Sequence, residues 1–172
     1  MLETKRLSIR PILASEADAY FDIAHDETLK EIGFYEPTRE SAWRTLMVSS
    51  FQVICFEGLL GIEEKNSGEL VGAIKIYRST DDAPYEISFF VTKKHRLLRM
   101  MEETLKAIIY EMRGMNKNGT CILAFKCSTT NIQYIEFMKI IKLIVRGFKL
   151  PYSEGYKYSN NVCIEESLEI KV

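Results

Sequence analysis

Residues 85–109, YEISFFVTKKHRLLRMMEETLKAII, constrain the fold of this chain more than any other stretch. In the first seven residues the side chains alternate, with Ile87 and Val91 facing one way and Glu86 and Phe90 the other, which is the period of a β-strand. The apolar residues that follow recur at steps of three and four, which indicates an amphipathic helix; they are Leu97, Met101, Leu105, Ile108 and Met112. A strand, a turn and a helix in this order present backbone N–H groups to an anion, so the stretch predicts an anion site.

Five basic side chains surround the predicted start of this helix; they are Lys93, Lys94, His95, Arg96 and Arg99. Cations at a helix N-terminus oppose the helix dipole by about 0.3–1 kcal/mol each, so the cluster is unfavourable unless an anion binds there. Two interpretations are open from these residues alone: a solvated basic turn, and a binding site for an anionic ligand.

The remaining segments predict a mixed α/β domain. Before the stretch, the pattern predicts a strand over residues 2–12, two or three helices over residues 15–51, and a hairpin with its turn at residues 65–68. Three consecutive strands should then be antiparallel. After the stretch come a strand over residues 120–127, a helix from Asn131 and a closing hairpin. That strand follows its predecessor through a helix, so the two should be parallel.

The second strand of the central hairpin carries a glycine in its interior. Leu70, Ile74 and Ile76 are expected on one face of this strand. Gly72 indicates either a close approach of another backbone or a β-bulge.

Composition limits the class of function. A chain of 172 residues, 47% hydrophobic and 27% charged, fits one globular domain over residues 1–172. Its net charge of -1 argues against general nucleic-acid binding. The charged start and the lack of an 18-residue apolar run predict a cytoplasmic protein with no membrane partner. The four cysteines and two histidines lack the spacing of metal ligands, so no metal site is expected.

Four segments in order resemble the GCN5-related N-acetyltransferase (GNAT) superfamily, and within it the ribosomal-protein N-terminal acetyltransferases. Residues 2–12, LETKRLSIRPI, resemble the family's ETxRLxLRPL strand. Residues 66–77, NSGELVGAIKIY, resemble its hairpin with the motif T/SGExIG, and residues 85–91, YEISFFV, resemble its xEIGYWL strand. TTNIQYIEFMKIIKLIVRGFKL resembles an N-x-x-S helix with a K-L-G-F turn, which falls on residues 140–143. The resemblance implies an α+β fold, with a mostly antiparallel splayed sheet of about seven strands and flanking helices. It also implies an acetyl-CoA-dependent N-acetyltransferase.

The resemblance further implies how acetyl-CoA binds. Its pantetheine arm would pair with the backbone of one strand, at Phe89, Phe90 and Val91. Its pyrophosphate would bind backbone amides at the helix start, from Arg96, Leu97, Leu98, Arg99, Met100 and Met101. Asn131 would hold the arm or cap its own helix.

The family's phosphate turn, Gln/Arg-x-x-Gly-x-Gly/Ala, has Arg99 and Met101 here where small residues are expected. In one interpretation Arg99 compensates as a bidentate phosphate ligand. In the other the site is degenerate, and the domain is a catalytically impaired coenzyme-binding or regulatory module.

Two side chains are candidates for the chemistry of acetyl transfer. Glu86 is the expected general base, and the alternative is a surface carboxylate. Tyr134 is the expected hydrogen-bond donor to the coenzyme sulfur; because it also lies on an apolar stripe, a core aromatic residue is the alternative. The acceptor is expected to be a primary amine, on a protein N-terminus or a small molecule, bound near the helices around Trp43. A monomer or a homodimer is expected.

Overall fold

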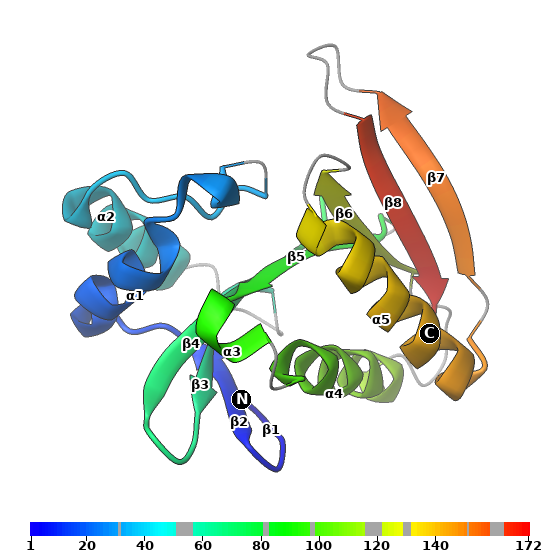
Figure 1. Cartoon of the computed structure of the whole chain (residues 1–172), viewed down its shortest axis with the longest axis horizontal. Coiled ribbons are helices and arrows are strands. Elements are labelled where there is room, and N and C mark those ends of the chain that lie inside the picture. Colours follow the sequence, from blue (N-terminus) through cyan, green and yellow to red (C-terminus); the bar gives the residue numbers. More distant parts are fainter. Residues whose placement is uncertain are drawn as a thin grey trace.

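A single twisted sheet with helices on both faces makes up the fold (Figure 1). The computed structural model describes residues 1–30, 32–50, 57–80, 83–96, 99–115, 122–128, 132–150, 152–158 and 164–172. At residues 50, 96, 126–128, 132–138, 152–158 and 164–169 it describes the backbone alone, without the side chains. The strands of this part are β1 (Leu2–Glu3), β2 (Leu7–Pro11), β3 (Gly58–Glu64), β4 (Glu69–Tyr77), β5 (Tyr85–Val91), β6 (Ile122–Ser128), β7 (Tyr152–Tyr158) and β8 (Ile164–Lys171). The helices are η1 (Ala14–Glu16), α1 (Ala17–Ala24), η2 (Glu27–Leu29), α2 (Arg39–Ser50), α3 (Lys93–Arg96), α4 (Met100–Met115) and α5 (Ile132–Phe148).

The strands lie in the order β1-β2-β3-β4-β5-β6-β8-β7. Every neighbouring pair is antiparallel except β5 and β6, which are joined through α4 and run parallel. The mostly antiparallel sheet and its parallel crossover are therefore confirmed. The sheet has eight strands rather than about seven because the first predicted strand folds back on itself, so that β1 and β2 pair.

Each face of the sheet has its own hydrophobic core. One core lies beneath α4 and α5 and includes Ile87 and Val91 of β5. The other lies beneath α1 and α2 and includes Phe90. The alternation predicted for β5 is therefore confirmed. Within the part of the chain that the structure describes, no helix combines the length and apolar character needed to span a membrane.

The face predicted for Leu70 is wrong because the pairing of β3 with β4 slips between Ile62 and Glu63. The slip makes Val71 the extra residue of a β-bulge, and a bulge reverses the alternation on one side of it. Val71 joins the core beneath α4 and α5 together with Ile74, whereas Leu70 lies in the core beneath α1 and α2.

Gly72 follows the bulge and lies against β5. A Cβ atom at this position would stand 2.3 Å from the carbonyl oxygen of Phe90 and 3.1 Å from the Cα of Val91. Both sequence interpretations of this glycine therefore hold: it adjoins a bulge and permits a close backbone approach.

Helix α5 does not end where the K-L-G-F resemblance places a turn. Residues 140–143 lie inside the helix, and the buried residues Ile144 and Val145 continue its apolar face. The helix ends instead at Phe148, and the next residue, Lys149, has a φ of 53°. The backbone N–H of Leu150 then donates to the carbonyl of Val145 at 3.0 Å, which is the pattern of a Schellman C-cap.

Candidate functional site

The sheet opens between β5 and β6. Their parallel pairing covers three residue pairs, of which Ile87 with Phe125 is the last. Beyond it, β5 continues to Val91 paired with β4, and β6 continues to Ser128 paired with β8. The two strands therefore diverge toward their carboxyl ends, as Figure 1 shows. The predicted splay of the sheet is confirmed.

The helix whose predicted start carries the basic residues 93–99 is in fact two helices. The short α3 ends at Arg96, and α4 begins at Met100. Between them Arg99 has a φ of 56°, a left-handed conformation that interrupts the helical backbone. The apolar periodicity begins at Leu97, between the two helices, so the sequence pattern gives no sign of the break.

The break also separates most of the basic residues from the N-terminus of α4. Lys93 pairs with Asp26, with Nζ 3.0 Å from a carboxylate oxygen. Lys94 pairs with Glu69 at 3.1 Å, and His95 is buried. The predicted crowding of cations at the start of the long amphipathic helix is therefore wrong: residues 93–96 form α3, and Lys93 and Lys94 have carboxylate partners.

Arg99 stands in the backbone conformation that glycine adopts most easily. The phosphate turn of the GNAT resemblance has a glycine at this position, and glycine would adopt the observed backbone conformation without strain. The side chain of Arg99 is exposed and, with Lys106, lines an open hollow of about 280 Å³. Met100 is buried and Met101 packs against the core. The side chains of Met100 and Met101 therefore point toward the core, and the side chain of Arg99 points toward solvent.

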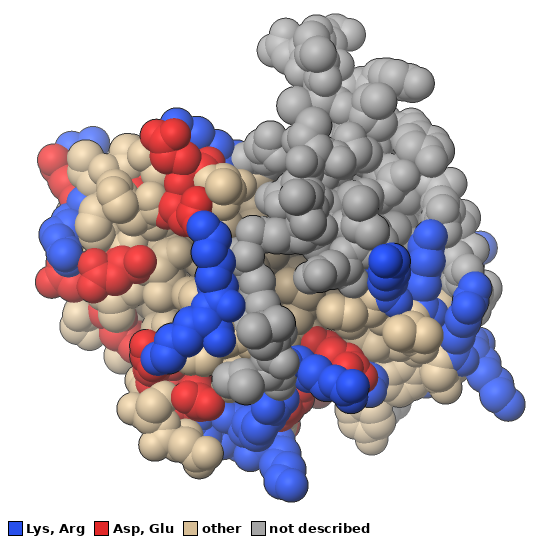
Figure 2. Space-filling model, in the orientation of Figure 1, with Lys and Arg blue, Asp and Glu red and all other residues tan. Residues whose placement is uncertain are grey.

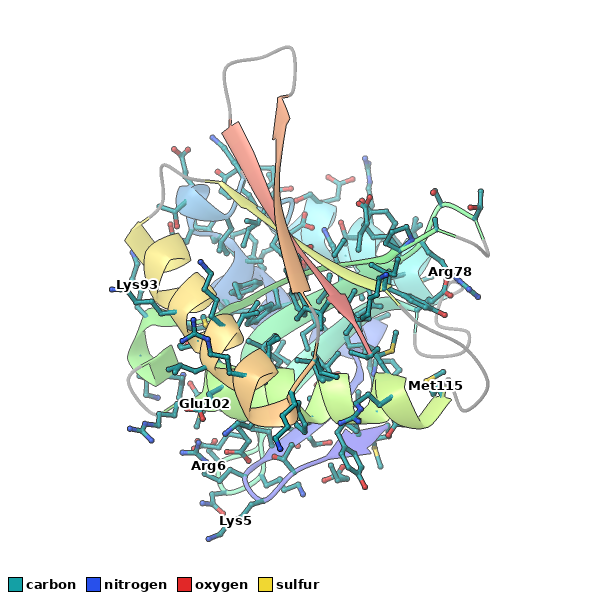
Figure 3. The ribbon with its side chains drawn as sticks, turned by 90° about the vertical axis from the view of Figure 1, so that its right-hand side faces the viewer. Lys5, Arg6, Arg78, Lys93, Glu102 and Met115 are labelled. Carbon is teal, nitrogen blue, oxygen red and sulfur yellow. The ribbon has the colours of Figure 1, made fainter. Side chains whose placement is uncertain are left out.

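Glu103, in the first turn of α4, ties the helix to the turn between β1 and β2. Its carboxylate accepts hydrogen bonds from the Thr4 hydroxyl at 2.6 Å, from the Arg6 backbone N–H at 3.0 Å and from Arg6 Nε at 2.7 Å. Burial raises the pKa of Glu103, but these hydrogen bonds outweigh it, so the pKa lies below the usual value. Figure 3 shows Arg6 at the same end of α4 as Glu102.

We expect Glu103→Gln to lower the free energy of unfolding by about 2 kcal/mol at pH 7, because hydrogen bonds to a charged acceptor are lost. The folded-state pKa is lowered, so this stabilisation is complete above the unfolded pKa of about 4.3 and disappears as the pH falls through the folded value. Urea unfolding at pH 7 and at about pH 2–3 measures the difference. Glu40→Gln, on the exposed surface of α2, should cost under about 0.5 kcal/mol. An equal loss for Glu103→Gln at both pH values would contradict the assignment.

A second hollow of about 300 Å³ lies between α4 and α5. It shares Glu102 and Lys106 with the first one and is otherwise lined mainly by apolar residues, including Leu143, Ile144 and Phe148. The two hollows therefore form one surface that begins at the polar N-terminus of α4 and continues along an apolar wall.

Glu86 lies on the opposite face of β5, which faces α1 and α2. Its partner across the strands is Tyr77 of β4, and the Tyr77 hydroxyl donates a hydrogen bond to the Glu86 carboxylate. The next pair on this face is Lys75 with Ser88. Glu86, Tyr77, Lys75 and Ser88 thus form a polar group on β4 and β5, next to the point where β5 leaves β6.

Lys75 extends from this group toward the segment after η2. Its ammonium donates to the carbonyl of Gly33 and lies 4.6 Å from the centroid of the Phe34 ring. Burial lowers the pKa of Lys75, and the negative charge of Glu36 opposes that change. Burial, aided by the same charge of Glu36, raises the pKa of Tyr20. Among the described residues the buried Tyr20 hydroxyl has no hydrogen-bond partner.

The structure assembles only part of the predicted set of site residues. Phe89 and Val91 belong to the core beneath α4 and α5, and the Phe90 ring packs edge-on against Phe34, with centroids 5.0 Å apart. Arg96 ends α3, and Tyr134 lies in the first half of α5; both are described by their backbone. Leu97, Leu98 and Asn131 lie outside the described residues.

Sequence reasoning missed Tyr77, Lys75 and Glu36. A signal for the first two was present, because Tyr77 and Lys75 alternate on the strand that pairs antiparallel with the strand of Glu86. Nothing in the sequence pattern indicates that Glu36 approaches Lys75, since the two lie on different elements far apart in the chain.

Comparison with protein families gives a match over most of the chain. A family model described as an acetyltransferase (GNAT) domain matches residues 6–141. No curated protein matches the chain in sequence.

Solved structures of similar shape cover nearly the whole chain. One, described as a GNAT-family acetyltransferase from Bordetella pertussis, has a TM-score of 0.73 at 15% identity and covers 98% of this chain and 97% of its own. A GNAT-family acetyltransferase from Bacillus anthracis has a TM-score of 0.73 at 15% identity, covering 99% and 96%. A ribosomal-protein-S5-alanine acetyltransferase from Vibrio fischeri has a TM-score of 0.65 at 14% identity, covering 99% and 94%. At these identities the likeness shows a shared fold.

Proposed function

Since the chain belongs to the GNAT acetyltransferase family, we propose that it transfers the acetyl group of acetyl-CoA to a primary amine. The observation that carries this proposal is the opening between β5 and β6. Two features of the structure support it: the N-terminus of α4, which follows β5 and α3 in the chain, favours an anion, and Glu86 on β5 is a carboxylate able to accept a proton.

The described residues fit the parts of acetyl-CoA. An extended arm fits along β5 at Phe89, Phe90 and Val91, beyond the last pair with β6. The α4 N-terminus and the exposed Arg99 are proposed to bind the pyrophosphate, and Lys106, which lines the same hollow, would have to leave Glu102, its ion-pair partner at 2.6 Å, to join them. The apolar wall that includes Leu143 is proposed to contact the adenosine group. When bound, acetyl-CoA supplies the activated acetyl thioester.

Glu86 is proposed to act as the general base. Glu86 accepts the proton that the ammonium form of the amine must lose before it can attack. The nitrogen then bonds to the carbonyl carbon as the carbon–sulfur bond breaks, and the departing thiolate is protonated as the acylated nitrogen releases its second proton. The Tyr77 hydroxyl holds the Glu86 carboxylate by a hydrogen bond and so fixes its orientation. Tyr134 remains a predicted proton donor to the departing sulfur.

The acceptor is proposed to approach from the face of β5 that carries Glu86, between that strand and α1 and α2. An amine on a protein N-terminus or on a small molecule fits this role. The relative from Vibrio fischeri is described as acting on an alanine of ribosomal protein S5, which is an acceptor of the first kind.

The test of the coenzyme site is a pair of substitutions at Arg99. If its guanidinium binds phosphate, Arg99→Ala should weaken acetyl-CoA binding by about 10- to 100-fold, measured by isothermal titration calorimetry. Arg99→Gly should weaken it similarly, although glycine relieves the left-handed backbone. Arg113→Ala, near the other end of α4, should leave the affinity unchanged. Tighter binding by Arg99→Gly would instead show that the side chain obstructs the site.

A further inference from the structure

Three side chains from two distant segments meet beside the hairpin of β3 and β4. Glu64 ends β3, Glu69 begins β4, and His95 lies on α3. Each offers one ligand atom, and these atoms all lie within 4.8 Å of one another.

The two carboxylates of this group are direct partners across the hairpin. Like charges directly opposite each other on neighbouring strands are destabilising. Among the described residues Lys94 lies 3.1 Å from Glu69, while Glu64 accepts a hydrogen bond from the Ser67 hydroxyl. The neighbouring Lys65 turns away to the Thr4 carbonyl and Glu3. The single ammonium of Lys94 therefore faces the two carboxylates of Glu64 and Glu69, so the three side chains together keep a net negative charge.

His95 faces these carboxylates from a buried position. Its side chain is 4% exposed, and its Nδ1 lies 2.7 Å from the Thr92 hydroxyl oxygen. Its Nε2 lies 4.0 Å from a carboxylate oxygen of Glu69, which is beyond hydrogen-bond distance. A hydrogen bond on one ring nitrogen, with the other directed at anionic groups, is how proteins hold a metal-ligating histidine.

We propose that Glu64, Glu69 and His95 bind a divalent transition-metal ion, for which Zn²⁺ is the probe, with water completing the coordination. Zn²⁺ binds carboxylate oxygen and imidazole nitrogen at about 2.0–2.2 Å, which sets neighbouring ligand atoms about 3.4 Å apart. The half-exposed Glu69 and Glu64 can close the remaining distance by side-chain rotation. The ion joins the hairpin to α3, just before the turn at Arg99. Motif spacing does not indicate such a site because His95 lies far from the two glutamates in sequence.

Thermal unfolding of the metal-stripped 172-residue chain tests the proposal. At Zn²⁺ concentrations about 100 times the dissociation constant, we expect the Tm to rise by roughly 5–10 °C. The rise should disappear in the triple variant Glu64→Gln, Glu69→Gln, His95→Ala. With Co²⁺, the visible absorption should lack the thiolate charge-transfer band that binding to the chain's cysteines would give. No rise at millimolar Zn²⁺, or an equal rise in the triple variant, would overturn the proposal.

Single substitutions separate a metal site from a simple ion pair between His95 and Glu69. Thr92→Val removes the hydrogen bond on Nδ1 and should lower Zn²⁺ affinity by about 10- to 100-fold. Lys94→Ala removes a competing cation and should raise the affinity, whereas Lys93→Ala, whose partner is Asp26, should leave it unchanged. If Lys94→Ala and Thr92→Val leave the affinity unchanged, the proposed ligand set is wrong. None of these readouts depends on acetyl-CoA.

Discussion

Glu86→Gln is expected to lower the turnover of acetyl transfer by about 100- to 10,000-fold, because a positioned general base contributes that much to a proton-transfer step. The Glu86 carboxylate is held by the Tyr77 hydroxyl, beside the opening between β5 and β6. The affinity for acetyl-CoA should stay the same, because no part of the proposed coenzyme site uses this side chain. Turnover and coenzyme affinity are measured separately, by thiol release and by calorimetry.

The pH dependence distinguishes a base from a structural carboxylate. The defect of Glu86→Gln should shrink as the pH approaches the pKa of the acceptor amine, since a neutral amine no longer needs a base to remove its proton before attack. Glu111→Gln, on α4, should leave turnover unchanged at every pH. If Glu86→Gln keeps full turnover at neutral pH, Glu86 is not the base.

Gly72→Ala is expected to cost roughly 3 kcal/mol of unfolding free energy, measured by urea denaturation. Its Cβ would stand 2.3 Å from the Phe90 carbonyl oxygen, which belongs to backbone and can move only if β5 moves. Because Phe90 lies beyond the last pair of β5 with β6, the same shift should also weaken acetyl-CoA binding.

Gly114→Ala is the matched control for this substitution. Gly114 lies in α4, and a Cβ at this position would have nothing within 4 Å, so alanine should stabilise the chain by about 0.5–1 kcal/mol through its higher helix propensity. A loss below about 0.5 kcal/mol for Gly72→Ala would contradict the close approach of β4 and β5.

Local periodicity predicted much of this fold. The alternation along β5 gave the correct faces for Ile87 and Phe90, and the hairpin turn at residues 65–68 is as expected. The errors lie where one residue departs from the regular backbone. The bulge at Val71 moved Leu70 to the other core, and the left-handed Arg99 divided one predicted helix into two. Gly72 indicated a bulge but not which residue it would displace, and Arg99 is not a glycine, so nothing in the sequence indicated its left-handed backbone.

The candidate site was less predictable than the fold because its contacts join distant segments. Lys93 and Lys94 look like part of an anion site in sequence, but in the structure they pair with Asp26 and Glu69. The contact between Lys75 and Gly33 likewise depends on how the segment after η2 lies over β4. The surface in Figure 2 shows acidic and basic side chains interspersed over the α1 and α2 region, and basic side chains gathered near α5. A net charge near zero conceals this distribution.

Thermal unfolding of the 172-residue chain with and without acetyl-CoA tests the proposed coenzyme site most directly. If the opening between β5 and β6 and the N-terminus of α4 form a coenzyme site, acetyl-CoA at about 100 times its dissociation constant should raise the Tm by roughly 5–10 °C. CoA should act in the same direction, since it retains the arm and the phosphates. An unchanged Tm at millimolar acetyl-CoA and CoA would contradict the account.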